Sequence, residues 1–186
     1  MKKYNDYDKA ETFTGDYERV TPGGHICVIL KVVVEEKDYG SLMRIAFDIA
    51  DGENEGFYDR QFKRKQQNDS GAKWPGMYYQ TIKENDLKYF KGFITCIEQS
   101  NSGFKWNWNE KELVGKLFGG IFGEEEFTTN DGQIKTSVKC RFTCSVNKVK
   151  EGVKVPEVKK LQGSSGSGTF NQFGQEVNMD DDSIPF

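Results

Sequence analysis

Aromatic rings and basic side chains alternate in the segment from Phe57 to Tyr79. The rings are Phe57, Tyr58, Phe62, Trp74, Tyr78 and Tyr79, and the cations are Arg60, Lys63, Arg64, Lys65 and Lys73. A single nucleic-acid strand offers base faces for stacking and phosphates for cations, so this mixture fits such a ligand. Glycines at positions 56, 71 and 76 predict a flexible loop that closes over the strand. In the competing interpretation, about half of these rings complete the protein core.

A second aromatic group lies in Ser100–Asn109, where Trp106 and Trp108 are two residues apart beside Lys105. In an extended chain both rings would project from one face and could stack on bases. Large aromatic residues also serve as packing residues, and the two tryptophans could equally cap a barrel beneath a helix.

A third candidate is a row of cations, Lys135, Lys139 and Arg141, on the outward side of a predicted strand. Their steps of about 13 and 7 Å are near the spacing of phosphates along an extended nucleic-acid strand. Arg44 is expected to point outward from another strand. A solvated strand face is the competing interpretation.

Enzymatic chemistry has little support. Four early carboxylates, Asp48, Asp51, Glu53 and Glu55, could hold the Mg²⁺ of a nuclease. The only histidine, His25, opens a predicted strand, and the chain has no Gly-rich phosphate-binding loop ending in Lys.

Zinc is the other metal to test, through Cys140 and Cys144 with His25 and Cys27. Four residues of strand span about 13 Å, too far for two ligands of one ion. We expect no catalytic residues, no cofactor and no metal site.

The elements that must position these residues begin with two strands. The β-branched run within Gly24–Glu36 predicts a buried strand, and a turn follows at 38–40. In residues 42–49, Met43, Ile45, Phe47 and Ile49 alternate with Arg44, Ala46 and Asp48. This alternation predicts a half-buried strand with Arg44 outward.

The middle of the chain predicts a short strand followed by a helix. The third strand could lie at 57–62 or at 77–80, within an irregular stretch from 51 to 80. Residues 83–100 predict a helix capped near Asn85 or Asp86, and its apolar face is Leu87, Phe90, Ile94 and Ile97.

The last strands are a Gly-rich bent strand at 113–127 and, after a hairpin turn at 130–132, an alternating strand. Its inward residues would be Ile134, Val138, Cys140, Phe142, Cys144 and Val146. Its outward residues would be Lys135, Ser137, Lys139, Arg141, Thr143 and Ser145.

The chain of 186 residues, 35% of them hydrophobic, is long enough for one modest core with appendages. We predict a domain at 1–162, a Gly/Ser-rich flexible linker at 163–178 and a separate tip at 179–186. The four cysteines are expected to be reduced core thiols. The chain lacks both a signal-like run and the roughly 20 apolar residues of a membrane span, so we expect a cytoplasmic protein.

Charge differs between these parts. The net charge is −3, and the four carboxylates after Gly163, without Lys or Arg, leave +1 for residues 1–162. Binding of a polyanion must therefore come from local placement of cations and from stacking.

The tip, MDDDSIPF, joins an acidic run to an apolar end. Asp180, Asp181 and Asp182 supply charge for steering, Pro185 restricts the backbone, and Ile184 and Phe186 offer apolar groups to a basic, apolar pocket on a partner. The tip closely resembles that of the bacterial and phage single-stranded DNA-binding (SSB) proteins. Ser183 departs from the commonest form, in which the acidic run meets Ile-Pro-Phe directly.

The resemblance implies an OB-fold that holds single-stranded DNA without sequence preference and a tip that recruits replication, repair and recombination proteins. The strand and helix order agrees with it: a mainly β protein with a five-stranded Greek-key barrel and one helix between strands 3 and 4. The cytoplasm would be that of a bacterial or phage-infected cell.

The first alternative is a replisome or recombination adaptor whose OB-fold mainly contacts protein, and the second is an RNA-binding protein. Whether the chain is a monomer or a homo-oligomer stays open at this point.

Overall fold

The computed structural model describes residue 5 and residues 18–161, so the predicted linker and tip lie outside the described residues. In chain order the elements are β1 (Gly23–Lys37), β2 (Gly40–Ile49), α1 (Phe57–Gln66), β3 (Met77–Ile82), α2 (Lys88–Ser100), the 3₁₀-helix η2 (Glu110–Leu113), β4 (Leu117–Thr128), β5 (Ile134–Cys144) and α3 (Val146–Glu151). No helix within this described part is both long and apolar enough to span a membrane.

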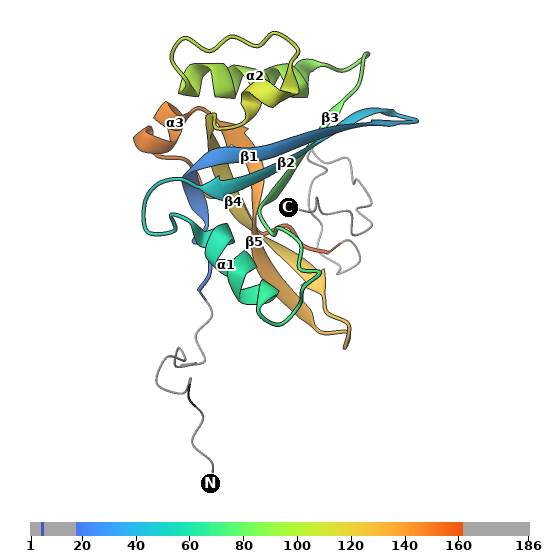
Figure 1. The fold of residues 1–186 in the computed structure, drawn as a ribbon, viewed down its shortest axis with the longest axis vertical. Helices are drawn as coiled ribbons and strands as arrows, with labels where there is room; N and C mark the ends of the chain where they lie inside the picture. Colours follow the sequence, from blue (N-terminus) through green and yellow to red (C-terminus); the bar gives the residue numbers. More distant parts are fainter. Residues whose placement is uncertain (1–4, 6–17, 162–186) are drawn as a thin grey trace.

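The described strands form one antiparallel sheet in the order β3-β2-β1-β4-β5. Long strand β1 pairs with β2 through residues 27–37 and with β4 through residues 23–28. Helix α2 lies across one end of the sheet and α1 lies near the other end (Figure 1). The mainly β class and the helix between the third and fourth strands are confirmed, whereas α1 and α3 were not predicted.

The core lies between the curved sheet and α2, and aromatic rings dominate it. Phe47 of β2 contacts Phe118 and Phe122 of β4, with ring centroids 5.6 and 6.1 Å apart. Phe93 of α2 contacts Phe118 at 6.3 Å. All four rings are at most 1% exposed, and burying each one stabilises the fold by about 2–3 kcal/mol.

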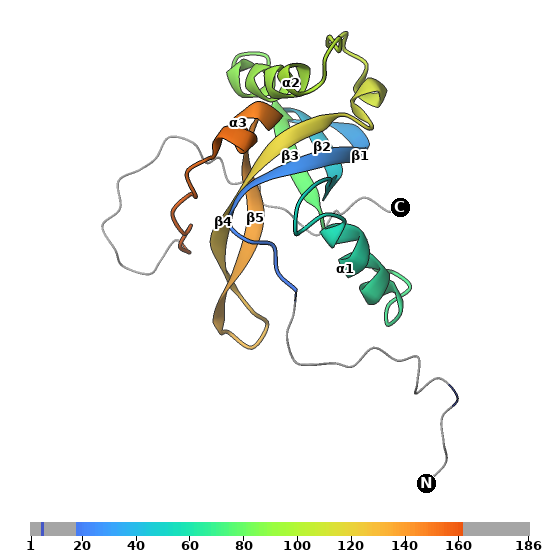
Figure 2. The same ribbon diagram turned by 90° about the vertical axis from the view of Figure 1, so that its left-hand side faces the viewer.

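Strand β2 is buried on both faces, so the prediction of a half-buried strand is wrong. Ala46 and Asp48, expected outward, are 0% and 6% exposed. The chain between β2 and β3 returns over the strand, since the Trp74 indole N–H donates to the Phe47 carbonyl at 3.0 Å. The view in Figure 2 shows α1 beside this end of the sheet.

Residues 57–62 form part of helix α1 and not a loop or a strand. The Asp48 carboxylate accepts the N–H groups of Tyr58 and Asp59, at 2.9 and 3.0 Å. The first N–H groups of a helix lack partners within the helix, and a carboxylate there stabilises the helix start. The other predicted site of the third strand, at 77–80, is confirmed within β3.

The helix predicted at 83–100 is present from residue 88 onward, with Phe90, Ile94 and Ile97 buried as expected and Phe93 added to them. The cap predicted at Asn85 or Asp86 is wrong, because residue 87 is the N-cap and no side chain caps the helix. Leu87 does not join the apolar face and is 41% exposed.

Strand β5 departs from its predicted alternation because of an irregularity. Cys140 pairs with Phe122 and Phe142 pairs with the adjacent Ile121, so one residue of β5 is extra at this point. A single extra residue moves the following side chains to the other face. Phe142 is accordingly 39% exposed, and Ile134, near the hairpin tip, is 59% exposed.

Thr143 follows this irregularity in β5 and was predicted to face outward. Its side chain lies near the Tyr78 hydroxyl of β3 and acts to lower the pKa of that hydroxyl against the larger effect of burial. Val146, expected to continue the strand, is buried at the start of α3.

After α3 the chain returns along β4 as a short strap, defined as residues 156–161. Lys159 forms a parallel bridge with Glu125. Its N–H donates to the Glu124 carbonyl at 2.9 Å, and its carbonyl accepts the Glu126 N–H at 2.9 Å. The Leu161 N–H donates to the Glu126 carboxylate at 3.1 Å. The strap therefore covers part of one edge of β4.

Candidate nucleic-acid interface

The aromatic loop, residues 101–109 between α2 and η2, holds the most exposed large apolar side chain of the described residues. Trp108 is 71% exposed. Its φ of 67° lies in the left-handed region, which costs a residue other than glycine about 1–3 kcal/mol. The ring lies 6.0 Å from Phe90, in the first turn of α2, and 6.2 Å from Trp106. Most of Trp108 is therefore open for a flat ligand to stack on.

Trp106 plays a different part in the same loop. Its ring is half-buried, packs against the core and meets Phe90 edge-on at 6.1 Å. Its indole Nε1 is buried without a hydrogen-bond partner among the described residues. Because the left-handed backbone at Trp108 turns the chain, the two tryptophans do not share an exposed face as an extended chain would place them.

Glu98, on α2, holds the first half of the aromatic loop. Its carboxylate accepts the Trp106 backbone N–H at 3.0 Å and pairs with Lys105 Nζ at 3.3 Å. The Trp106 N–H, more than the Lys105 ammonium, lowers the pKa of Glu98. The Lys105 side chain is 83% exposed, so its ammonium remains accessible from solvent.

Glu112, on η2, holds the second half. Its Oε1 accepts from the side-chain amides of Asn107 and Asn109, at 2.9 and 3.1 Å. The amide oxygens of these asparagines in turn accept backbone N–H groups, those of Asn109 at 3.1 Å and Lys111 at 3.3 Å. Carboxylates on two different elements thus fix the residues before and after Trp108.

Arg44 and Tyr79 lie in two segments whose pairing was not predicted from the sequence. In the sheet they are cross-strand partners on β2 and β3. Opposed residues have Cβ atoms about 4.5–5.5 Å apart, so a ring and a cation share this face. The prediction of an outward Arg44 is only partly right. Its guanidinium pairs with Glu35 and its side chain is 13% exposed. Tyr79 is half-buried.

The rings of the 57–79 segment are mostly packing residues. Phe57, Tyr58 and Trp74 are 6%, 7% and 5% exposed and belong to the core, and Phe62 and Tyr78 are partly buried against it. Burial raises the pKa of Tyr58 and Tyr78. The buried rings Phe57, Tyr58 and Trp74 are therefore not displayed for a base in this structure. Phe62 and Tyr78 keep part of their surface exposed, and their assignment as stacking residues stays a prediction.

The cations of that segment remain at the surface. Arg60 pairs with Glu18, and Lys63 pairs with Asp59 at 2.7 Å across one helical turn. These partners compete with phosphate for the two cations.

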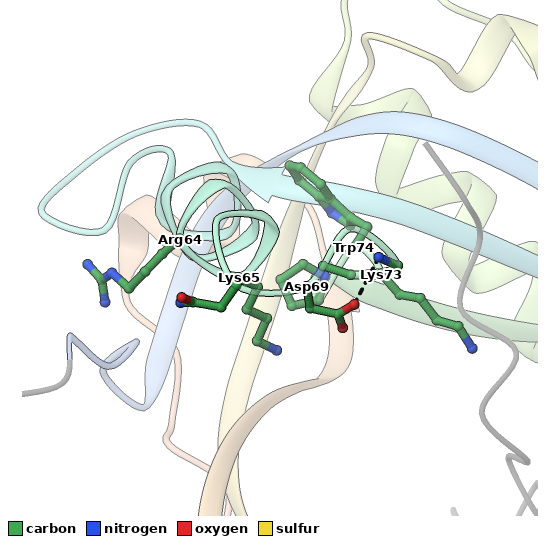
Figure 3. Close-up of a pocket in the computed structure, with 9 residues that line it drawn as sticks. Arg64, Lys65, Asp69, Lys73 and Trp74 are labelled. Carbon is green, nitrogen blue, oxygen red and sulfur yellow. Dashed lines mark hydrogen bonds between the residues drawn. The ribbon is translucent and has the colours of Figure 1, made fainter.

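Arg64, Lys65 and Lys73 line an open pocket of about 700 Å³ between the end of α1 and the loop that precedes β3. Figure 3 shows their charged ends spread apart around this pocket, whereas the Trp74 ring lies on its inner side. Asp69 also lines the pocket, and its carboxylate accepts a hydrogen bond from the Gly71 N–H at 2.9 Å. The pocket therefore offers cations without an exposed ring.

The predicted row on β5 is interrupted. Lys139 pairs with Glu125 at 3.3 Å, and Arg141 donates to the Glu157 carbonyl of the strap and lies 5.5 Å from the Phe142 ring. Lys135 is exposed beyond them. Because the strand irregularity lies between residues 140 and 142, the three cations do not form the row along one regular strand face that the sequence predicted.

The candidate metal ligands do not converge. Asp48 caps α1, and within residues 18–161 no group of three or more His, Cys, Asp or Glu side chains is arranged to hold an ion. All four cysteines carry free thiols. Burial raises the pKa of Cys27 and raises that of Cys144 to about 11, so these thiols stay protonated at neutral pH.

Sequence reasoning missed the residues that hold Trp108, namely Glu98, Asn107, Asn109 and Glu112. One signal was present: asparagine tolerates turn conformations and flanks Trp108 on both sides. The carboxylates gave no local signal, since Glu98 lies on another element. The predicted partner-binding residues 180–182 and 184–186 lie outside the described residues.

Comparison of the chain with models of protein families finds no match, and a search of curated protein sequences finds none either.

Proposed function

We propose that the chain is a sequence-independent single-stranded DNA-binding protein that coats and protects DNA during replication, repair and recombination. The observation that carries the proposal is the display of Trp108, whose ring is largely exposed and whose backbone is left-handed, three residues after Lys105 in the chain. Stacking on an aromatic side chain contributes about 1–3 kcal/mol per base and tolerates every base, because every base has a flat face.

The fold underlying this function is an OB-type Greek-key barrel. Three features support it: β1 pairs with both β2 and β4, α2 lies between the third and fourth strands, and the sheet is strongly curved (Figure 1). Closure is supported by the side chains of the two outer strands, because Thr143 of β5 lies close enough to the Tyr78 hydroxyl of β3 to oppose the rise in pKa that burial causes there. Barrels of this type bind oligonucleotides on the face of strands 2 and 3, which here holds Arg44 and Tyr79.

Phosphates would be contacted locally, because residues 1–162 have a net charge of only +1. Lys105 lies three residues before the exposed tryptophan in the chain, and the cations around the pocket precede β3. A strand along β3 would thus meet cations at one end, the Arg44 and Tyr79 pair in the middle and Trp108 near the other end. Such binding weakens with added salt.

The tip at 179–186 would recruit replication and recombination proteins. The support for this part is chemical: three aspartates precede an Ile-Pro-Phe end. Charge steers the encounter, and the apolar end supplies contact area inside a partner pocket.

The test is the affinity of full-length protein for a labelled dT oligonucleotide, compared with matched duplex at two salt concentrations. Trp108→Ala should weaken binding about tenfold. Phe127→Ala is the matched control, since Phe127 is also exposed, at 38%, but lies on the β4–β5 hairpin. Absence of binding by the wild type would overturn the proposed function, and an unchanged affinity of Trp108→Ala would remove the aromatic loop from it.

The adaptor is favoured by one observation. Leu87 and Tyr89, at the start of α2 near Trp108, are 41% and 42% exposed, and a surface that includes an aliphatic side chain fits protein as well as DNA. Under this alternative, Trp108→Ala would reduce capture of a protein partner while the already weak DNA binding hardly changed.

A further inference from the structure

Trp108 combines two costs that a folded chain usually avoids: a left-handed backbone in a residue other than glycine and a large apolar ring in water. Phe90 and Trp106 support one side of the ring but leave most of it exposed. Side-chain packing alone therefore does not explain why the backbone keeps this conformation.

The residues on both sides of Trp108 are tied to Glu112 through their side-chain amides. Its Oε1 receives the amides of Asn107 and Asn109 within 3.1 Å, so a single oxygen connects the residue before Trp108 with the residue after it. The Asn107 oxygen also accepts the Asn109 N–H, which closes a tight turn around Trp108. Relaxing φ at Trp108 would separate these two amides and break hydrogen bonds.

Glu98 fixes the backbone of the residue just before Asn107. It accepts the Trp106 N–H at 3.0 Å from a rigid helix, which fixes where the loop leaves α2. Glu112 then remains the only carboxylate, among the described residues, whose side-chain hydrogen bonds span Trp108.

We propose that Glu112 is a positioning residue for the Trp108 stacking site: it touches no nucleotide itself and acts by holding Trp108 in its left-handed, exposed conformation. The proposal rests on the proposed function, because it assigns Glu112 a role in binding single-stranded DNA through Trp108.

The sign of the expected effect separates this role from simple electrostatics. A carboxylate near a bound polyanion repels phosphate, so removing it should strengthen binding if Glu112 acted only through its charge. If Glu112 holds Trp108, removing it should weaken binding. Replacement by glutamine removes the charge but keeps an amide oxygen that can accept both asparagine amides.

The experiment measures dT-oligonucleotide affinity for full-length Glu112→Ala, Glu112→Gln and the control Glu110→Ala, whose side chain takes no part in this turn. We expect Glu112→Ala to bind about three- to tenfold more weakly, because strain at Trp108 is then released before binding. Glu112→Gln and Glu110→Ala should bind at least as well as the wild type. The dependence of log K on log salt should not change, because no phosphate contact is lost.

A double-mutant cycle tests whether the effect passes through Trp108. In a Trp108→Ala background, Glu112→Ala should cause little further loss, because the two changes are coupled. Tighter binding of Glu112→Ala, or a full loss that persists without Trp108, would overturn the proposal.

A measurement without DNA tests the positioning role of Glu112 separately from the proposed DNA-binding function. In protein labelled with 5-fluorotryptophan, Glu112→Ala should shift or broaden the ¹⁹F resonance of Trp108 and leave that of Trp74 unchanged. An unchanged Trp108 resonance would overturn the positioning role even if the protein binds DNA. Absence of DNA binding by the wild type would overturn the proposed function, while the resonance would still decide whether Glu112 holds Trp108.

Discussion

The 57–79 segment and the aromatic loop have similar compositions but display opposite groups. Both place aromatic rings beside basic side chains, five cations in the first and Lys105 alone in the second. The first buries Phe57, Tyr58 and Trp74 and leaves its cations at the surface, whereas the second exposes Trp108. Composition alone therefore identifies residues able to bind single-stranded DNA but does not identify the ones that are available.

The difference has a physical cause. In α1 the helical period gathers Phe57, Tyr58 and Phe62 on the side that packs against the core. The aromatic loop has no regular period, and hydrogen bonds to Glu98 and Glu112 set its shape. A ring can remain exposed in a fixed position when polar contacts, and not apolar packing, hold its backbone.

The largest expected difference between the two segments is in their contribution to the free energy of unfolding. Trp74→Ala should lower the free energy of unfolding by about 3–5 kcal/mol, because it removes a buried ring and leaves a cavity. Trp108→Ala should change it by less than about 1 kcal/mol, since little apolar burial is lost. Urea unfolding of both variants measures the difference. Equal destabilisation would contradict the division into a packing ring and a displayed ring.

An intermediate effect is expected for the cations of the 57–79 segment, in the salt dependence of DNA binding. Lys65→Gln, in the pocket that follows α1, should weaken dT-oligonucleotide binding and reduce the slope of log K against log salt by about 0.7, the share of one phosphate contact. Lys154→Gln, an exposed cation after α3, is the control. DNA binding should change the ¹⁹F chemical shift of Trp108 in the wild type, and the same change should occur in Lys65→Gln. Loss of that change would mean that the pocket also positions the stacked base.

The smallest effect concerns pH. The pKa of Glu98 is lowered from 4.5, so its contribution to holding the aromatic loop is present above that value and lost as pH falls through the lowered pKa. The Trp108 resonance should therefore shift in acid below about pH 4.5. In Glu98→Gln this titration should disappear. An identical acid transition in that variant would assign the change to another group.

The sequence predicted the features that depend on short-range patterns. The β-branched run of β1, the turn at 130–132 and the spacing of Phe90, Ile94 and Ile97 all led to elements that the structure contains. Helix α1 was not predicted, because its start depends on Asp48 from a different strand. The exposure of Phe142 in β5 was not predicted either, because one extra residue in a strand leaves the local alternation of the sequence unchanged, whereas Cys144 is buried as predicted.

The candidate site was predicted in its residue types and not in its geometry. Trp106, Trp108 and Lys105 were identified, but their different exposures depend on a backbone turn. The pairing of Arg44 with Tyr79 required the register of β2 and β3, which the irregular stretch at 51–80 concealed. The groups that hold Trp108 became visible only through hydrogen bonds between different elements.

The strap also determines how mechanical force would enter the domain. A protein that pulls on the residues after Leu161 loads the backbone hydrogen bonds between Lys159 and β4, together with the 2.8 Å pair of Lys159 with Glu125, before it loads the aromatic core. Trp108, on the aromatic loop over α2, lies outside this path of load. Traction on the C-terminal segment would peel off the strap first and leave the ring in place.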